Sequence, residues 1–162
     1  MRSDITVRHA IRSDADGLRR FLTGLSTRTA YLRFFTGLGT VQDRMLRWLL
    51  PRPPGRVVLL AVRGGEIVGH AMYATVAGDA GVADLAVVVA DAWQRRGLGR
   101  RLVRGLLDTA QAHGVREVRF TVLAGNPGAH RLVAGFAPRR PQVVLDGGVY
   151  EYVVPLAVPA AA

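Results

Sequence analysis

The stretch Gln94-Arg95-Arg96-Gly97-Leu98-Gly99-Arg100 decides how the rest of the sequence is organised. It follows the apolar, β-branched run Val87-Val88-Val89 and opens a segment whose apolar residues recur at helical spacing. A strand, a glycine turn and a helix in this order present backbone N–H groups that lack intrahelical partners, and such groups bind anions. Gly97 and Gly99 carry no Cβ, so a ligand can approach the backbone closely. A helix with a glycine-rich start and a solvated arginine face would look the same locally, so the motif alone leaves both interpretations open.

Composition limits the classes of protein to consider. The 162 residues predict one domain over residues 1–162, and the net charge of +10 comes from arginine alone because the chain has no lysine. A positive field attracts phosphorylated ligands, acidic proteins or nucleic acid. Nucleic acid is not the expected partner, because the arginines are spread along the chain without a recognition motif.

Several further absences in the sequence bear on localisation and cofactors. Without cysteine there are no disulfides, thiolate metal sites or cysteine nucleophiles, and no His, Asp or Glu group has metal-ligand spacing, so no metal is expected. The N-terminus lacks the apolar region of a signal peptide, and no apolar run approaches the roughly 20 residues that span a bilayer. We therefore expect a cytoplasmic protein with no membrane partner.

Periodicity predicts the order of helices and strands. The expected elements are a strand at 5–9, a helix from Ser13 to about residue 25, helices at 26–35 and 41–50, strands at 56–63, 66–76 and 82–89, a helix at 98–113, a strand at 115–123, a helix at 126–133 and a hairpin of strands 142–145 and 149–154. This order predicts a mixed α/β (α+β) fold with a parallel crossover around the long helix.

At this point the chain resembles the GNAT superfamily of acyl-CoA-dependent N-acetyltransferases. The residues Gln94 to Gly99 match its pyrophosphate-binding pattern, Gln/Arg-x-x-Gly-x-Gly/Ala. The segments Ile11-Arg12-Ser13-Asp14-Ala15-Asp16 and Tyr31-Leu32-Arg33-Phe34-Phe35 are similar to the acetyltransferase domains of bacterial protein-lysine acetyltransferases. The resemblance implies a GNAT fold, with a mixed central sheet of about seven strands, a parallel splayed pair and flanking helices.

The resemblance also implies acetyl-CoA as co-substrate and a set of residues that bind it. The backbone from Arg95 to Arg100 would hold the pyrophosphate, the exposed strand edge would bind the pantetheine arm, and Asn126 would contact the pantetheine region. The implied binding residues are Val87, Val88, Val89, Gln94, Arg95, Arg96, Gly97, Leu98, Gly99, Arg100 and Asn126. Arg100, Arg101 and Arg104 are candidates for the 3′-phosphate, although for any single one of them a solvated helix face is the favoured interpretation.

Acetyl transfer to an amine requires a base, because a lysine with a pKa near 10.4 is only about 0.1% neutral around pH 7.4. The candidate is Asp84, ten residues before Gln94, where related sequences carry a glutamate. Its shorter side chain would act through water or attract a cationic acceptor; alternatively, Asp84 is a strand-start residue or an ion-pair partner. The family tyrosine that protonates the leaving thiolate is replaced by Val133, so His130 is the candidate acid, with a surface histidine as the alternative.

Two functions follow from these residues. The first is an N-acetyltransferase that moves an acetyl group to a primary amine, with protein lysine among the acceptors, by direct attack in a ternary complex because no cysteine can carry an acyl group. The second is an acyl-CoA-binding sensor or regulatory module, suggested by the aspartate at position 84 and by the missing tyrosine. A homodimer through the C-terminal strands stays open.

Overall fold

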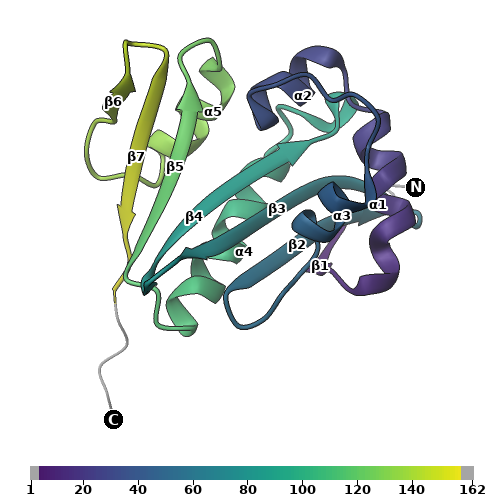
Figure 1. Ribbon diagram of the computed structural model, residues 1–162, viewed down its shortest axis with the longest axis horizontal. Coiled ribbons are helices and arrows are strands. Elements are labelled where there is room, and N and C mark those ends of the chain that lie inside the picture. Colours follow the sequence, from purple (N-terminus) through teal and green to yellow (C-terminus); the bar gives the residue numbers. More distant parts are fainter. Residues whose placement is uncertain (1–3, 158–162) are drawn as a thin grey trace.

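The computed structural model describes residues 4–157, apart from the side chains of residues 143 and 145 (Figure 1). Its elements are β1 (Thr6–His9), a 3₁₀ turn (Arg12–Asp14), α1 (Ala15–Thr23), α2 (Thr27–Phe34), α3 (Asp43–Leu49), β2 (Arg56–Arg63), β3 (Glu66–Val76), β4 (Asp79–Val89), a 3₁₀ turn (Asp91–Trp93), α4 (Leu98–Ala112), β5 (Glu117–Leu123), α5 (Pro127–Ala134), β6 (Gln142–Leu145) and β7 (Val149–Pro155). The predicted order of elements is confirmed.

The strands form one seven-stranded sheet in the order β1-β2-β3-β4-β5-β7-β6. All neighbouring strands are antiparallel except β4 and β5, which are parallel and are connected through α4. The predicted mixed α/β sheet with one parallel crossover is therefore confirmed.

The parallel pair is splayed. β4 and β5 pair only where Val82, Ala83 and Asp84 face residues 117–119, and no register is kept beyond that point. β4 continues to Val89 along β3, whereas β5 continues along β7, so the two strands diverge towards their carboxyl ends (Figure 1). Over the described residues 4–157, the divergence leaves one edge of β4 without a strand partner next to the glycine turn.

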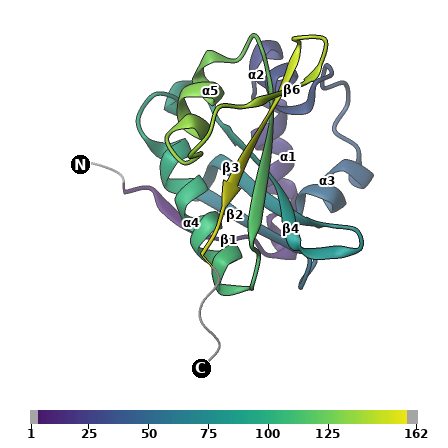
Figure 2. The same ribbon diagram turned by 90° about the vertical axis from the view of Figure 1, so that its left-hand side faces the viewer.

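Helices cover both faces of the sheet, because strand residues alternate between them. In β2, Leu59 and Ala61 lie in the cluster that includes α4, whereas Val58 and Leu60 lie in the cluster that includes α1 and α3. Figures 1 and 2 show α4 on one face and α1 and α3 on the other. The predicted apolar face of α4 is confirmed by its buried residues: Leu98, Leu102, Val103, Leu106, Leu107 and Ala110.

Ser13, predicted as the N-cap of the first helix, lies one residue before the observed N-cap, Asp14. The Asp14 carboxylate accepts hydrogen bonds from the backbone N–H of Ile11 (2.8 Å) and from the Arg8 guanidinium (2.7 and 2.9 Å). These bonds stabilise a 3₁₀ turn over Arg12–Asp14, and α1 begins only at Ala15. The contact between Arg8 and Asp14 joins β1 to this turn, which the local sequence pattern did not predict.

Candidate functional site

The glycine turn presents free N–H groups at the start of α4, as the sequence predicts. Gly97 adopts the left-handed conformation (φ +79°), and so does Arg95 (φ +59°). Among residues 4–157, no side chain caps α4, and its first turn carries no acidic residue. An anion that approached the N–H groups of residues 98–100, at the positive end of this 15-residue helix, would therefore meet no carboxylate from that turn.

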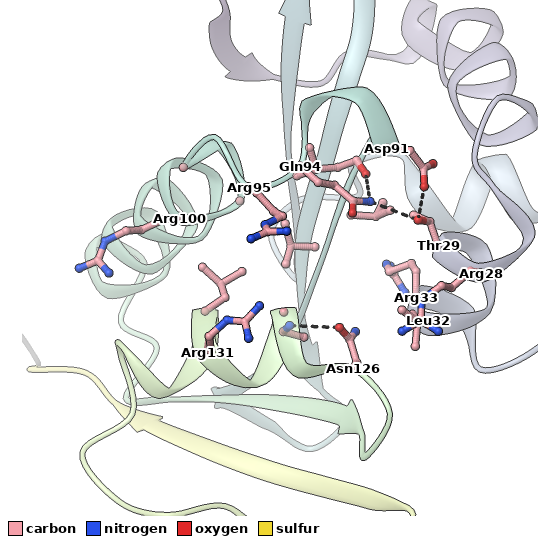
Figure 3. Close-up of a pocket in the computed structure, with 18 residues that line it drawn as sticks. Arg28, Thr29, Leu32, Arg33, Asp91, Gln94, Arg95, Arg100, Asn126 and Arg131 are labelled. Carbon is pink, nitrogen blue, oxygen red and sulfur yellow. Dashed lines mark hydrogen bonds between the residues drawn. The ribbon is translucent and has the colours of Figure 1, made fainter.

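Hydrogen bonds from α2 fix the loop that leads into this turn (Figure 3). Asp91 accepts bonds from the Ser26 backbone N–H (3.0 Å), the Ser26 hydroxyl (2.7 Å) and the Thr29 hydroxyl (2.7 Å). Gln94 Nε2 donates to the Thr29 hydroxyl (3.1 Å) and to the Val89 carbonyl (3.0 Å). Burial alone would raise the pKa of Asp91, but the bonds from Ser26 and Thr29 lower it below its usual range. The side chain of Gln94 thus positions the turn.

A cleft of about 590 Å³ opens between the splayed strands, the glycine turn, α2 and α5 (Figure 3). Nine predicted binding residues line it: Val87, Val88, Val89, Gln94, Arg95, Gly97, Gly99, Arg100 and Asn126. Nine lining residues were not predicted: Arg28, Thr29, Leu32, Arg33, Asp91, Gly128, Ala129, Arg131 and Leu132. Most of these lie on α2 and α5, which reach the cleft only through tertiary packing.

Two predicted binding residues do not line the cleft. Leu98 is buried in the core, and the Arg96 guanidinium lies over the ring of Trp93, 5.0 Å from its centroid. Their predicted contribution is therefore limited to the backbone N–H groups of the turn. Among the candidates for a 3′-phosphate, Arg101 donates to the Ile5 carbonyl (2.8 Å).

The cleft has a strongly positive lining. Five arginines and one carboxylate, Asp91, line it among the described residues; the arginines are Arg28, Arg33, Arg95, Arg100 and Arg131. Asp91 already accepts three hydrogen bonds from α2. Such an excess of forked cationic donors beside a helix N-terminus suits a ligand with several phosphate groups.

Asn126 lies at the opposite side of the cleft and caps α5. Its Oδ1 accepts the backbone N–H of Ala129 at 3.1 Å, which leaves the Nδ2 donors for a ligand (Figure 3). Gly128 and Ala129 line the cleft beside it, and a Cβ on Gly128 would meet only the Asn126 side chain, at 3.8 Å. The α5 terminus therefore offers an open polar wall facing β4.

The predicted base, Asp84, lies in a second cavity of about 470 Å³. It is the last residue of β4 that pairs with β5, and its side chain is exposed. Asp84 forms no ion pair within residues 4–157, although Arg119 is its register partner on β5 and lines the same cavity. β4 lines this cavity with residues 84–86 and the first cleft with residues 87–89, and Arg33 lines both.

The other predicted catalytic residue, His130, does not line the cleft. Its Nδ1 accepts the Tyr152 hydroxyl (2.7 Å), and its Nε2 donates to the Leu123 carbonyl (3.1 Å). Both ring nitrogens therefore join α5 to the sheet, and Val133, at the position of the family tyrosine, is buried. This arrangement favours a structural role for His130, and its role as thiolate acid stays a prediction.

Over residues 4–157, no three His, Cys, Asp or Glu side chains gather in a way that would hold a metal ion. Over the same residues, no helix combines the length and hydrophobicity that a bilayer crossing requires.

Comparisons with known proteins agree with this geometry. The model of the acetyltransferase (GNAT) family matches residues 21–136. The GNAT domain of S. lividans PAT superposes with a TM-score of 0.86 at 25% identity, over 94% of this chain and 90% of that one. A GNAT-family acetyltransferase from Streptococcus pneumoniae gives 0.74 at 23% identity, over 95% and 100% of the two chains.

The structure of yncA from Salmonella typhimurium, which holds its cofactor acetyl-CoA, gives a TM-score of 0.70 at 24% identity, over 99% of this chain and 98% of that one. No curated protein matches the sequence.

Proposed function

Because the chain belongs to the GNAT acetyltransferase family, we propose that it transfers an acetyl group from acetyl-CoA to a primary amine. One observation carries the proposal: the β4–β5 splay opens an arginine-lined cleft directly at the uncapped N-terminus of α4. The anion site and the free strand edge lie side by side, as a ligand with a pyrophosphate and a pantetheine arm requires.

The residues of the cleft fit such a ligand. The N–H groups of residues 98–100 would bind the pyrophosphate, with charge from Arg95 and Arg100. Ala90 N donates to Val68 of β3, so the N–H of Val89 faces the opposite, open edge, because successive N–H groups of a strand point to opposite sides. That edge and the Asn126 amide would hold the pantetheine arm.

The chemistry then divides between the two cavities. Acetyl-CoA supplies an activated thioester, and the Val89 N–H is the candidate donor for the negative charge that develops on its oxygen. Asp84, in the second cavity, would accept a proton from the incoming ammonium group, directly or through water. Because the chain has no cysteine, we propose direct attack by the amine in a ternary complex.

The acceptor is a separate question. The likeness to the GNAT domain of PAT, a protein acetyltransferase, supports protein lysine among the acceptors. The second candidate function is an acyl-CoA-binding module without turnover. It is favoured by the shorter acid at position 84 and by the buried Val133.

Two measurements on the full chain separate the candidates. Calorimetry with acetyl-CoA tests binding, and a thiol-release assay with a panel of small amines and lysine peptides tests transfer. A transferase binds acetyl-CoA and releases thiol with at least one acceptor. Binding without amine-dependent thiol release on any acceptor would favour the module, and no binding would refute both.

A further inference from the structure

Arg33 lies where the two cavities meet. It comes from α2 and lines both the cleft at the β4–β5 splay and the cavity that contains Asp84 (Figure 3 shows the first). Of the five arginines that line the cleft, Arg33 alone also lines the second cavity. Because residues 87–89 of β4 line the cleft and residues 84–86 line the second cavity, an amine held in the second cavity would reach a thioester in the cleft past this guanidinium.

Within residues 4–157, Arg33 has no carboxylate partner, and its guanidinium lies over the Phe34 ring, 4.7 Å from the centroid. Burial lowers its pKa to about 10, so the group is still cationic at neutral pH. Its buried Nε has no hydrogen-bond partner, and Arg33 forms no ion pair among residues 4–157. Arg119, the other arginine of the second cavity, donates from Nε to Glu117 at 2.7 Å. A desolvated cation without a counter-ion is costly, so Arg33 is suited to an anion that arrives with a ligand.

The rest of the second cavity is mostly apolar. Its hydrophobic walls are Phe34, Phe35, Met45, Trp48, Leu49, Met72, Ala74, Leu85 and Ala86. Asp84 is its only carboxylate among the described residues. A volume of about 470 Å³ lies in the range of pockets that bind small molecules. The cavity therefore combines one arginine without an ion-pair partner among residues 4–157 (Arg33), a second arginine held by Glu117 (Arg119), one carboxylate and a wide aromatic and aliphatic wall.

We propose that the acceptor is a small hydrophobic amine that carries a carboxylate next to its nitrogen, such as an apolar α-amino acid. This inference rests on the proposed function and names the substrate class of the same site. Arg33 would bind the carboxylate, Asp84 would attract the ammonium group, and the apolar wall would hold the side chain. A lysine side chain in a protein has no carboxylate beside its amine and would leave Arg33 unpaired.

The reaction balances without another reactant. The ammonium group loses one proton to Asp84, the nitrogen forms a bond to the acetyl carbon, and the carbon–sulfur bond breaks. A second proton leaves the nitrogen and ends on the sulfur. The products are an N-acetylated amino acid, free thiol and one proton released to water.

The test compares acceptors that differ only in the carboxylate. L-phenylalanine is paired with 2-phenylethylamine, L-leucine with 3-methylbutylamine, and a lysine peptide forms a third arm. For the wild type, we expect kcat/KM to favour each amino acid over its decarboxylated analogue by about 100-fold or more. Arg33→Gln should remove that preference by lowering kcat/KM for the amino acids only, and Arg33→Lys should restore part of it.

Arg63→Gln is the matched control. Like Arg33, Arg63 is half-buried, has a buried Nε without a hydrogen-bond partner among the described residues and lies over an aromatic ring (Trp93, 4.8 Å from the centroid), but it lines neither cavity. It should leave the preference unchanged. If Arg33→Gln lowers kcat/KM equally for the amino acid and for its decarboxylated analogue, Arg33 acts on the acyl donor and the inference is overturned. A lysine peptide as the best wild-type acceptor would also overturn it.

A binding measurement keeps the test independent of turnover. Trp48 lines the second cavity, so its fluorescence in a Trp93→Phe background reports occupancy. N-acetyl-L-phenylalanine should bind, N-acetyl-2-phenylethylamine should bind at least tenfold more weakly, and Arg33→Gln should abolish the difference. Carboxylate-dependent binding without turnover would support the inference and refute the proposed catalysis. No difference between the two probes would overturn the inference alone.

Discussion

Replacing Asp91 with alanine should detach α2 from the loop that leads into the glycine turn. Asp91 accepts three hydrogen bonds from α2 and its N-cap, two from Ser26 and one from Thr29, at 2.7 to 3.0 Å. No other carboxylate lines the cleft among the described residues. α2 also carries Arg28 and Arg33, so the variant should affect both the stability of the fold and the binding of acetyl-CoA.

The size of the effect follows from the three bonds. A net hydrogen bond in a folded protein contributes about 0.5 to 1.5 kcal/mol, and more when one partner is charged. Because Asp91 is exposed, water replaces part of each bond, so we take about 0.7 kcal/mol per bond. The expected loss in the free energy of unfolding is about 2 kcal/mol at pH 7.

Urea unfolding at a series of pH values tests both the size of this loss in stability and its origin in the Asp91 carboxylate. The pKa of Asp91 is lowered in the folded state, so its contribution is complete above the unfolded-state pKa of about 3.9 and is lost as the pH falls through the folded value. The difference between wild type and Asp91→Ala should be constant from pH 5 to 7 and shrink below about pH 4. Asp108→Ala, on the exposed face of α4, should stay within about 0.5 kcal/mol of wild type.

Two results would refute this reasoning. The free energy of unfolding of Asp91→Ala could match that of the wild type within about 0.5 kcal/mol at pH 7, or its deficit relative to the wild type could stay constant below pH 4. Either outcome would mean that the three hydrogen bonds do not hold α2 against the loop. Calorimetry on the same variant should show weaker binding of acetyl-CoA, since Arg28 and Arg33 line the cleft.

Three further substitutions test separate parts of the site. Asp84→Asn should lower kcat/KM about 100-fold or more and leave the Kd for acetyl-CoA unchanged. Asp79→Asn is the control, because Asp79 pairs with Arg116 outside both cavities, and it should keep the wild-type kcat/KM. If the two variants are equally active, Asp84 is not the catalytic base. Gly97→Ala should lower the free energy of unfolding by about 1 to 2 kcal/mol, because a φ of +79° strains any residue with a Cβ even though this Cβ would meet open space. Gly37→Ala is the control in the same urea assay, because a Cβ there also meets open space but φ is not positive. An equal loss of unfolding free energy in the two variants would contradict the strain. His130→Gln should lower the free energy of unfolding by about 1 to 2 kcal/mol and leave kcat/KM within about threefold of the wild-type value. A loss of kcat/KM of about 100-fold with unchanged stability would instead support His130 as the acid that protonates the thiolate.

The glycine turn and the order of elements could be predicted from the sequence, because both depend on local patterns. Apolar residues of α4 recur at helical spacing, and Gly97 marks a left-handed position at its start. The splay could also be expected, but only through the family resemblance. No property of the run Val82 to Val89 shows by itself where pairing with β5 ends.

The contribution of α2 could not be predicted, because it depends on contacts between distant residues. Ser26 and Asp91 are 65 residues apart, and neither carries a local signal for the other. The sequence places Arg33 in a family-like segment, but its lack of an ion-pair partner within residues 4–157 depends on where the carboxylates lie in the fold. For the same reason, the sequence could not show that His130, predicted as a thiolate acid or a surface histidine, is hydrogen-bonded to Tyr152.

A crystal structure of the protein with acetyl-CoA is the most direct test of the cleft as the acyl-donor site. We predict that pyrophosphate oxygens accept hydrogen bonds from the N–H groups of residues 98–100, and that the pantetheine arm runs along the edge of Val87–Val89 towards Asn126. Acetyl-CoA bound elsewhere, or bound here without contact to the N-terminus of α4, would contradict the assignment.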